Sequence, residues 1–186
     1  LIVLPAVVEA GDSYSTVNKS IRVDSDQSIG SVDSVNGSIR IGDNASVKSV
    51  DSVNGAIKLG NDVTVDGDVE SVNGAINIEA GCEVGSDVET VNGGIRLQDT
   101  RVAGNVETVN GQIRILDRSE VSGNVLVKKP HGWNHNSRNK PVRVEIGQDV
   151  LVHGDLIFEH PVELKLHETA RVGEIIGDEV EMVASS

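Results

Sequence analysis

The tripeptide Val-Asn-Gly recurs along this 186-residue chain at an almost constant interval, and this repeat limits the folds that the chain can adopt. The repeated asparagines are Asn36, Asn54, Asn73, Asn92 and Asn110, and Asn18 stands in a degenerate earlier copy. Successive asparagines are 18, 18, 19, 19 and 18 residues apart. A unit of this length is too short for a helix-turn-helix repeat, which needs more than about 30 residues.

Aliphatic residues keep the same phase in every copy. The third and fifth positions after each Asn hold Ile21/Val23, Ile39/Ile41, Ile57/Leu59, Ile76/Ile78, Ile95/Leu97 and Ile113/Ile115. Two further columns are Ile29, Val47, Val65, Val84, Val102 and Val121, and then Val32, Val50, Val69, Val88, Val106 and Val125. Because the aliphatics are two or three residues apart and Gly, Asn and Asp interrupt them, each copy predicts two or three short strands separated by tight bends.

One such unit cannot bury its apolar side alone, so the copies must stack, with equivalent residues about 4.8 Å apart. The same register continues through Val144/Ile146, Val150/Val152, Leu156, Leu164/Leu166, Ala170/Val172 and Ile176. The sequence therefore predicts an all-β protein, a single-stranded parallel β-helix (β-solenoid) of about nine or ten coils. Coils of 18 residues resemble left-handed hexapeptide helices, but the frequent intervals of 19 favour a right-handed coil.

We expect a single domain over residues 1–186. Within it, residues 1–14 are expected to form an N-terminal capping coil, and residues 177–186 an edge strand followed by a tail. Residues 128–141 interrupt the pattern and are expected to form an insertion loop. The apolar start of the chain is too short for a complete signal peptide. We expect an exported protein of the periplasm or cell envelope that has lost its signal peptide, with a cytoplasmic location as the alternative.

The composition agrees with a thin aliphatic core, since aromatic residues make up only 2% of the chain. A formal net charge of −13 argues against a nucleic-acid partner, because phosphate binding needs concentrated Lys and Arg. No apolar run approaches the roughly 20 residues that a membrane-spanning helix needs. Cys82 is the single cysteine, which excludes an intramolecular disulfide, and it falls at a small inward position where we expect a buried filler.

The repeated asparagines are interpreted as a structural ladder in which stacked amides hydrogen-bond from coil to coil, rather than as a binding row. The Asn-Gly pair also predicts a bend with positive φ. Ser or Thr stands two residues before each Asn, and its hydroxyl is expected to bond to the backbone of the same bend.

Two charged rows run along the repeat. A basic row lies between the paired aliphatics and so points outward, and an acidic row lies three residues before each Asn. The basic row is Arg22, Arg40, Lys58, Arg96 and Arg114, and the acidic row is Asp33, Asp51, Glu70, Glu89 and Glu107. Stacked like charges repel, so each row should gain from flanking charges or an oppositely charged partner. A solvated face that keeps the rod soluble is the simpler interpretation.

The insertion loop is wholly basic within this acidic chain and contains the single Trp. Its candidate binding residues are Lys128, Lys129, His131, Trp133, His135, Arg138 and Lys140. Trp beside cationic side chains can stack on a sugar or hold an anionic group, and the alternative is a loop folded against the rod. A metal site at His131 and His135 would need further ligands such as His153 or His160, so no metal site is predicted.

The Val-Asn-Gly-x-Ile-Arg-Ile unit, followed by Gly-Asn/Asp-Val, resembles the repeats of bacterial β-solenoid proteins of the bactofilin-like and adhesin-like kind. The resemblance covers most of residues 15–176. It implies a packing pattern rather than a reaction, and bactofilins imply end-to-end self-assembly.

These observations predict a non-catalytic structural or adhesive cell-envelope protein that needs no cofactor. No nucleophile elbow, phosphate loop or dinucleotide fingerprint is present in the sequence. The expected partners are a second copy of the chain or an anionic envelope glycan. A polysaccharide-binding or polysaccharide-acting β-helix is one alternative, and a bactofilin-like polymer is the other.

Overall fold

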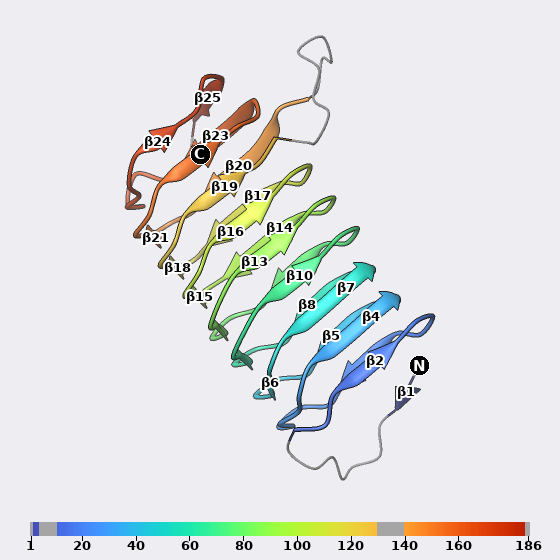
Figure 1. Ribbon diagram of the computed structural model, residues 1–186. Coiled ribbons are helices and arrows are strands. Elements are labelled where there is room, and N and C mark those ends of the chain that lie inside the picture. Colours follow the sequence, from blue (N-terminus) through green and yellow to red (C-terminus); the bar gives the residue numbers. More distant parts are fainter. Residues whose placement is uncertain (1, 4–10, 130–139, 185–186) are drawn as a thin grey trace.

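The computed structural model describes residues 2–3, 11–129 and 140–184, and its strands form three parallel sheets around one rod (Figure 1). We name these sheets A, B and C. Sheet A contains β1 (Ile2–Val3), β3 (Ile21–Val23), β5 (Ile39–Ile41), β8 (Ile57–Leu59), β11 (Ile76–Ile78), β14 (Ile95–Gln98), β17 (Ile113–Leu116), β20 (Val142–Ile146), β23 (Val162–Leu166) and β25 (Val180–Val183).

The other two sheets complete each coil. Sheet B contains β2 (Tyr14–Thr16), β4 (Val32–Asn36), β7 (Val50–Asn54), β10 (Val69–Ser71), β13 (Val88–Thr90), β16 (Val106–Thr108), β19 (Val125–Val127), β22 (Leu156–Phe158) and β24 (Ile175–Ile176). Sheet C contains β6 (Ser46–Val47), β9 (Thr64–Val65), β12 (Glu83–Val84), β15 (Arg101–Val102), β18 (Glu120–Val121) and β21 (Leu151–Val152). The chain passes from B to A to C in every full coil, which confirms the predicted β-solenoid.

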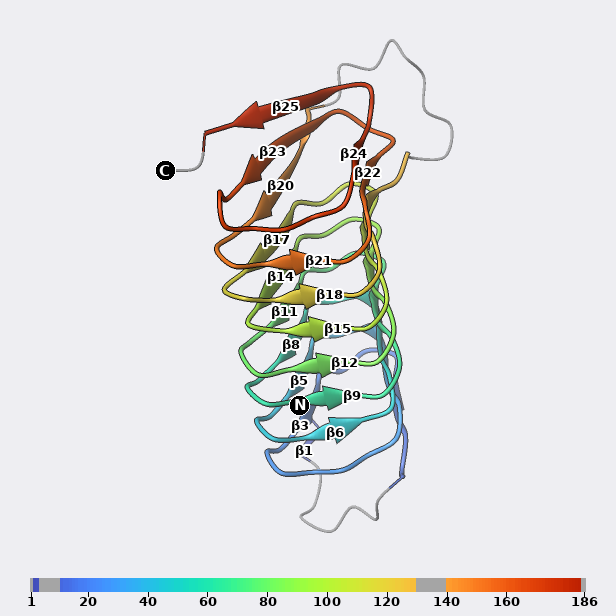
Figure 2. The ribbon, with the colours of Figure 1, turned by 90° about the vertical axis from the view of Figure 1, so that its left-hand side faces the viewer.

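The coil is right-handed, as the 19-residue intervals favoured. In Figure 2 sheet C faces the viewer, and its strands run from left to right while the coils climb toward the C-terminal end. The rod has about eight turns, so the prediction of nine or ten was too high. The estimate counted the partial coils at both ends, where β1, β24 and β25 have no companion strand in sheet C.

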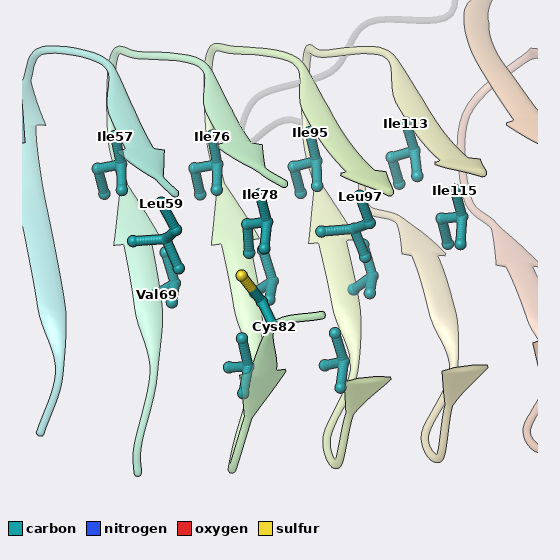
Figure 3. Close-up of a cluster of buried hydrophobic side chains, with 14 of the residues drawn as sticks. Ile57, Leu59, Val69, Ile76, Ile78, Cys82, Ile95, Leu97, Ile113 and Ile115 are labelled. Atoms are coloured by element: carbon teal, nitrogen blue, oxygen red, sulfur yellow. The ribbon is translucent and has the colours of Figure 1, made fainter. Parts of the chain in front are cut away.

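The predicted aliphatic columns are the core. In Figure 3 the residues Ile57, Ile76, Ile95 and Ile113 stack in one ladder and Leu59, Ile78, Leu97 and Ile115 in another. All eight side chains are buried, because in-register parallel pairing places each one directly on its equivalent in the next coil.

Cys82 and Ile176 were both predicted to point inward, and the structure confirms only the first. Cys82 is the predicted filler: it is buried, its Sγ bonds to the Gly60 carbonyl at 3.0 Å, and burial raises the pKa of its thiol to about 11. Ile176 was placed in an inward column, but the register pairs Ile175 with the buried Leu156. Ile176 therefore lies on the outward side of β24.

The Val-Asn-Gly corner joins sheet B to sheet A and is built from two ladders. Each Asn donates its side-chain amide to the side-chain oxygen of the Asn one coil earlier, over 2.9–3.0 Å from Asn36 to Asn110. Each Gly lies so close to the preceding coil that an added Cβ would meet a backbone carbonyl oxygen there at less than 3.0 Å, at Gly37, Gly55, Gly74, Gly93 and Gly111. The glycines are thus required for close backbone stacking.

The predicted positive φ at this corner was wrong. Among the described residues, positive φ occurs at Gly11 and in the turns between sheets A and C, at Asp26, Asn44, Asp62, Gly81, Asp99, Asp117, Arg118 and Asp149. Asp and Asn tolerate this conformation better than most residues. The hydroxyls of Ser34, Ser71 and Thr90 do donate to backbone carbonyl oxygens, but these oxygens belong to the corner of the preceding coil and not to the same bend.

The third corner, from sheet C to sheet B, uses the repeated Gly-Asp/Asn step. The side-chain oxygen of each Asp or Asn accepts the backbone N–H of its equivalent one coil later, in a chain that runs Asp68, Asp87, Asn105, Asn124, Asp155 and Glu174. These polar ladders fix the coil spacing, and with it the spacing of every outward-facing side chain.

Candidate functional site on the outer face of sheet B

Two outward rows run side by side along sheet B. The first, which we call the acid row, is the predicted set Asp33, Asp51, Glu70, Glu89 and Glu107, and the strand register stacks its members one per coil. The second, which we call the valine row, is the Val of each Val-Asn-Gly. Its members Val17, Val35, Val53, Val72 and Val91 are 40–60% exposed. Side chains in a strand alternate between faces, so these valines point outward like the acids two positions before them.

The two rows line one groove of about 410 Å³, which we call the valine–acid groove. It extends from Ser15 on β2 to Lys128, just past β19, and so follows the axis of the rod over several coils. This face therefore presents an apolar strip beside a row of carboxylates, and both rows repeat at the spacing between coils.

The acid row is under electrostatic strain at neutral pH. Burial, hydrogen bonding to Asp33 and the charges of Asp33 and Glu70 raise the pKa of Asp51 to about 6, although a bond from Ser49 acts in the opposite direction. Burial and the charge of Glu107 also raise the pKa of Glu89. This is the repulsion expected of stacked like charges that are partly removed from water.

Sheet A shows the contrast. Its predicted basic row points outward as expected, and acids flanking it pair with several of its members. The ion pairs are Arg22 with Asp24 at 3.5 Å, Lys58 with Glu79 at 2.8 Å and Arg114 with Glu145 at 2.8 Å. Lys165 also bonds to Glu145 at 3.2 Å, and the two cations hold the pKa of Glu145 below its usual value despite partial burial.

Sheet C is balanced in the same way. Arg101 lies between Glu83 and Glu120, at 3.1 Å and 3.8 Å, and His153 bonds to Glu120 at 2.7 Å. Opposite charges thus alternate from coil to coil on this face. Sheet B differs because, within the described part of the chain, only one of the five acids in its row, Glu107, makes an ion pair.

One cation closes the acid row. The register pairs Thr108 with Val127, and the next residues in the two coils are Val109 and Lys128. Lys128 therefore occupies the position that a valine has in the preceding coil. Its Nζ reaches sideways to the carboxylate of Glu107, which is 93% buried, and this bond raises the pKa of Lys128. An ammonium on an aliphatic stem is therefore seated at the C-terminal end of the groove.

The other predicted loop residues are only partly described. Lys129 donates its backbone N–H to Glu159 at 3.1 Å, and Lys140 is exposed. His131, Trp133, His135 and Arg138 lie outside the described residues. The structure therefore brings Lys128 into the groove and leaves the proposed binding role of the remaining set a prediction.

Lys140, which precedes β20 by two residues, lines a second cavity of about 730 Å³. The walls include Asn110, the last member of the amide ladder, together with Arg143 and the buried His160. Arg143 pairs with Glu163 at 3.0 Å. The polar lining could hold a sugar or an anionic group, and we call this cavity the insertion pocket.

Within the described residues, no group of three or more His, Cys, Asp or Glu side chains is placed to hold a metal ion. The same part of the chain contains no helix with the length and apolar character to cross a membrane. No protein-family model, curated protein or solved structure matches the chain. The groove and its chemistry are consequently the main guide to function.

We expect Asp51→Asn to stabilise the protein at neutral pH. The pKa of Asp51 is higher in the folded than in the unfolded chain, so its contribution to stability is greatest at low pH and is lost as the pH rises through about 6. At pH 7.5 the substitution should raise the melting temperature by about 2–4 °C, equivalent to about 1 kcal/mol after allowance for solvent screening. At pH 4 the gain should largely vanish.

Thermal melts at the two pH values test this, with Asp178→Asn as the control because it removes a carboxylate from an exposed turn outside the groove. Equal effects of the two substitutions at pH 7.5 would show that the acid row is not strained.

Proposed function

We propose that this chain is a non-catalytic structural or adhesive rod of the bacterial cell envelope, and that it engages a cationic partner through the valine–acid groove. The observation that carries the proposal is the difference between the three faces. Acidic and basic side chains pair on sheets A and C, whereas four carboxylates on sheet B have no ion pair within the described residues. A repeated face of one sign favours multivalent attachment over chemistry at a single point.

A non-catalytic role agrees with the repetition itself. Each carboxylate of the acid row has nearly the same neighbours as the next, with a valine beside it and a Ser or Thr behind it. Catalytic acids and bases in one site instead need environments that push their pKa values in opposite directions.

Cosedimentation with isolated cell-envelope fragments tests the proposal. Glu70→Gln/Glu89→Gln removes two charges from the groove, and Glu168→Gln/Glu181→Gln removes two from exposed positions elsewhere. We expect the first pair of substitutions to weaken envelope binding at least about tenfold and the second to leave it nearly unchanged. Equal binding by both variants would contradict a role for the groove, and pelleting without envelope would instead indicate a bactofilin-like polymer.

The insertion pocket favours a second candidate, a polysaccharide-binding or polysaccharide-acting β-helix. Its cations Lys140 and Arg143 suit the anionic envelope glycan that the basic loop predicts, whereas the acid row would repel such a chain. Binding of an acidic glycan that is lost in Lys140→Gln but retained in Glu70→Gln/Glu89→Gln would favour this candidate over the first.

A further inference from the structure

The groove already shows how it accepts an ammonium group. The stem of Lys128 lies at the end of the valine row and its Nζ binds a member of the acid row. Aliphatic stems pack on apolar surface while their charged ends reach polar partners, and Lys128 does both within this groove. The remaining acids, Asp33, Asp51, Glu70 and Glu89, make no ion pair with any Lys, Arg or His in residues 11–129 and 140–184.

The spacing of the free carboxylates restricts which cation can bind to them. Four acids on consecutive coils are about 4.8 Å apart and span about 14 Å. Two nitrogens separated by three methylenes are about 5 Å apart when extended, and by four methylenes about 6 Å. A linear chain of such units would place one ammonium at each carboxylate and lay its methylenes along the valine row.

An extended peptide fits less well. Its side chains on one face repeat about every 6.7 Å, which does not match the coil spacing. Its backbone would also need hydrogen-bond partners, and the backbone groups of sheet B are already bonded to the neighbouring coils. A ligand that consists only of ammonium groups and methylenes has neither difficulty.

We infer that the valine–acid groove binds a linear aliphatic polyamine along the axis of the rod, with its ammonium groups on Asp33, Asp51, Glu70 and Glu89. The inference rests on the proposed role of this groove as the cation-binding face and names the ligand class. Bound polyamine relieves the repulsion within the acid row, and the valines discriminate it from a hydrated metal cation.

Isothermal titration of the full chain with spermine, a linear tetraamine, tests the inference. The comparison ligands are a diamine with three methylenes, Mg²⁺ and tetralysine. We expect spermine to bind once per chain and at least about tenfold more tightly than each of the other three. Glu70→Gln/Glu89→Gln should weaken spermine binding at least about tenfold, while the control Glu168→Gln/Glu181→Gln should leave it within about twofold.

The outcomes separate the ligand class from the function. Tetralysine binding more tightly than spermine, with loss in the groove variant, would overturn the polyamine and retain a cationic partner. Mg²⁺ binding as tightly as spermine would show a diffuse counter-ion effect and overturn the inference. If envelope binding depends on the groove but spermine does not bind, the inference is overturned and the proposed function is retained. If neither envelope binding nor spermine binding is weakened by Glu70→Gln/Glu89→Gln, the proposed function is overturned as well.

Discussion

Gly93→Ala is expected to lower the free energy of unfolding by at least about 3 kcal/mol. A Cβ at this position would meet the carbonyl oxygen of Gly74 in the preceding coil well inside 3.0 Å. The obstacle is backbone that bonds to coils on either side, so it cannot move away as a flexible side chain can. Relief of the clash must separate two coils at the corner, and this separation weakens the hydrogen bond between the side-chain amides of Asn73 and Asn92.

Gly94→Ala is the matched control, because it makes the same change one residue later. There the nearest atom to an added Cβ is Cγ of Gln112 at 3.3 Å, on a side chain that can shift. Neither glycine has a positive φ, so backbone strain does not separate the two cases. Gly94→Ala should therefore be neutral or stabilise by up to about 1 kcal/mol through the entropy of the unfolded chain.

Urea denaturation of both variants measures the difference, and hydrogen exchange locates it. The backbone N–H of Asn92 bonds to the Val72 carbonyl at 2.8 Å, and its exchange should accelerate in Gly93→Ala alone. Equal stability of the two variants would mean that the coils do not stack as closely at this corner as the structure has them.

The repeat made the inward columns predictable from sequence. Once units of 18–19 residues must stack, equivalent residues lie on top of each other, and a column that is always aliphatic can only face the core. The number of turns could not be predicted as accurately, because the residues of a partial end coil have the same sequence pattern as those of a complete coil. Only the strand pairing shows that Ile175 has a neighbour on one side but not on the other.

The valine row was missed although a signal was present. Counting alternately from the buried Val32 puts Asp33 outward, Ser34 inward and Val35 outward. In the prediction from sequence, the Val of Val-Asn-Gly served only to mark the repeat and was assigned to neither face of the strand. The alternation rule alone would have identified an exposed apolar row beside the acids.

The ion pairs could not be predicted in the same way. The pairs on sheet A include members of different columns, such as Lys58 with Glu79, and their formation depends on side-chain direction at the ends of strands. The explanation of the Asn-Gly pair failed for a related reason. A sequence shows that Gly is required but not whether the requirement is a positive φ or the closeness of another backbone, and Gly93 demonstrates the second.

The same substitution at two valines of one repeat unit should destabilise the protein by very different amounts. Val88 on β13 is fully buried in the core, whereas Val91 is 40% exposed in the valine row. Val88→Ala removes two methyl groups and leaves a cavity between coils that the stacked backbone cannot close, which should cost about 2–3 kcal/mol in the free energy of unfolding. Val91→Ala removes partly hydrated surface and should cost less than about 0.5 kcal/mol.

Urea denaturation measures both values, and an unchanged slope with denaturant would show that the change lies in stability rather than in the extent of unfolding. The functional readout should show the reverse order. Val88→Ala leaves the surface of the groove intact, so spermine binding by its folded form should match the unaltered chain. Val91→Ala removes apolar contact from the groove and should weaken that binding about fourfold, as the loss of roughly one buried methylene would. If Val91→Ala destabilises the rod as much as Val88→Ala, then the valine is a core residue and sheet B has no apolar strip for a ligand.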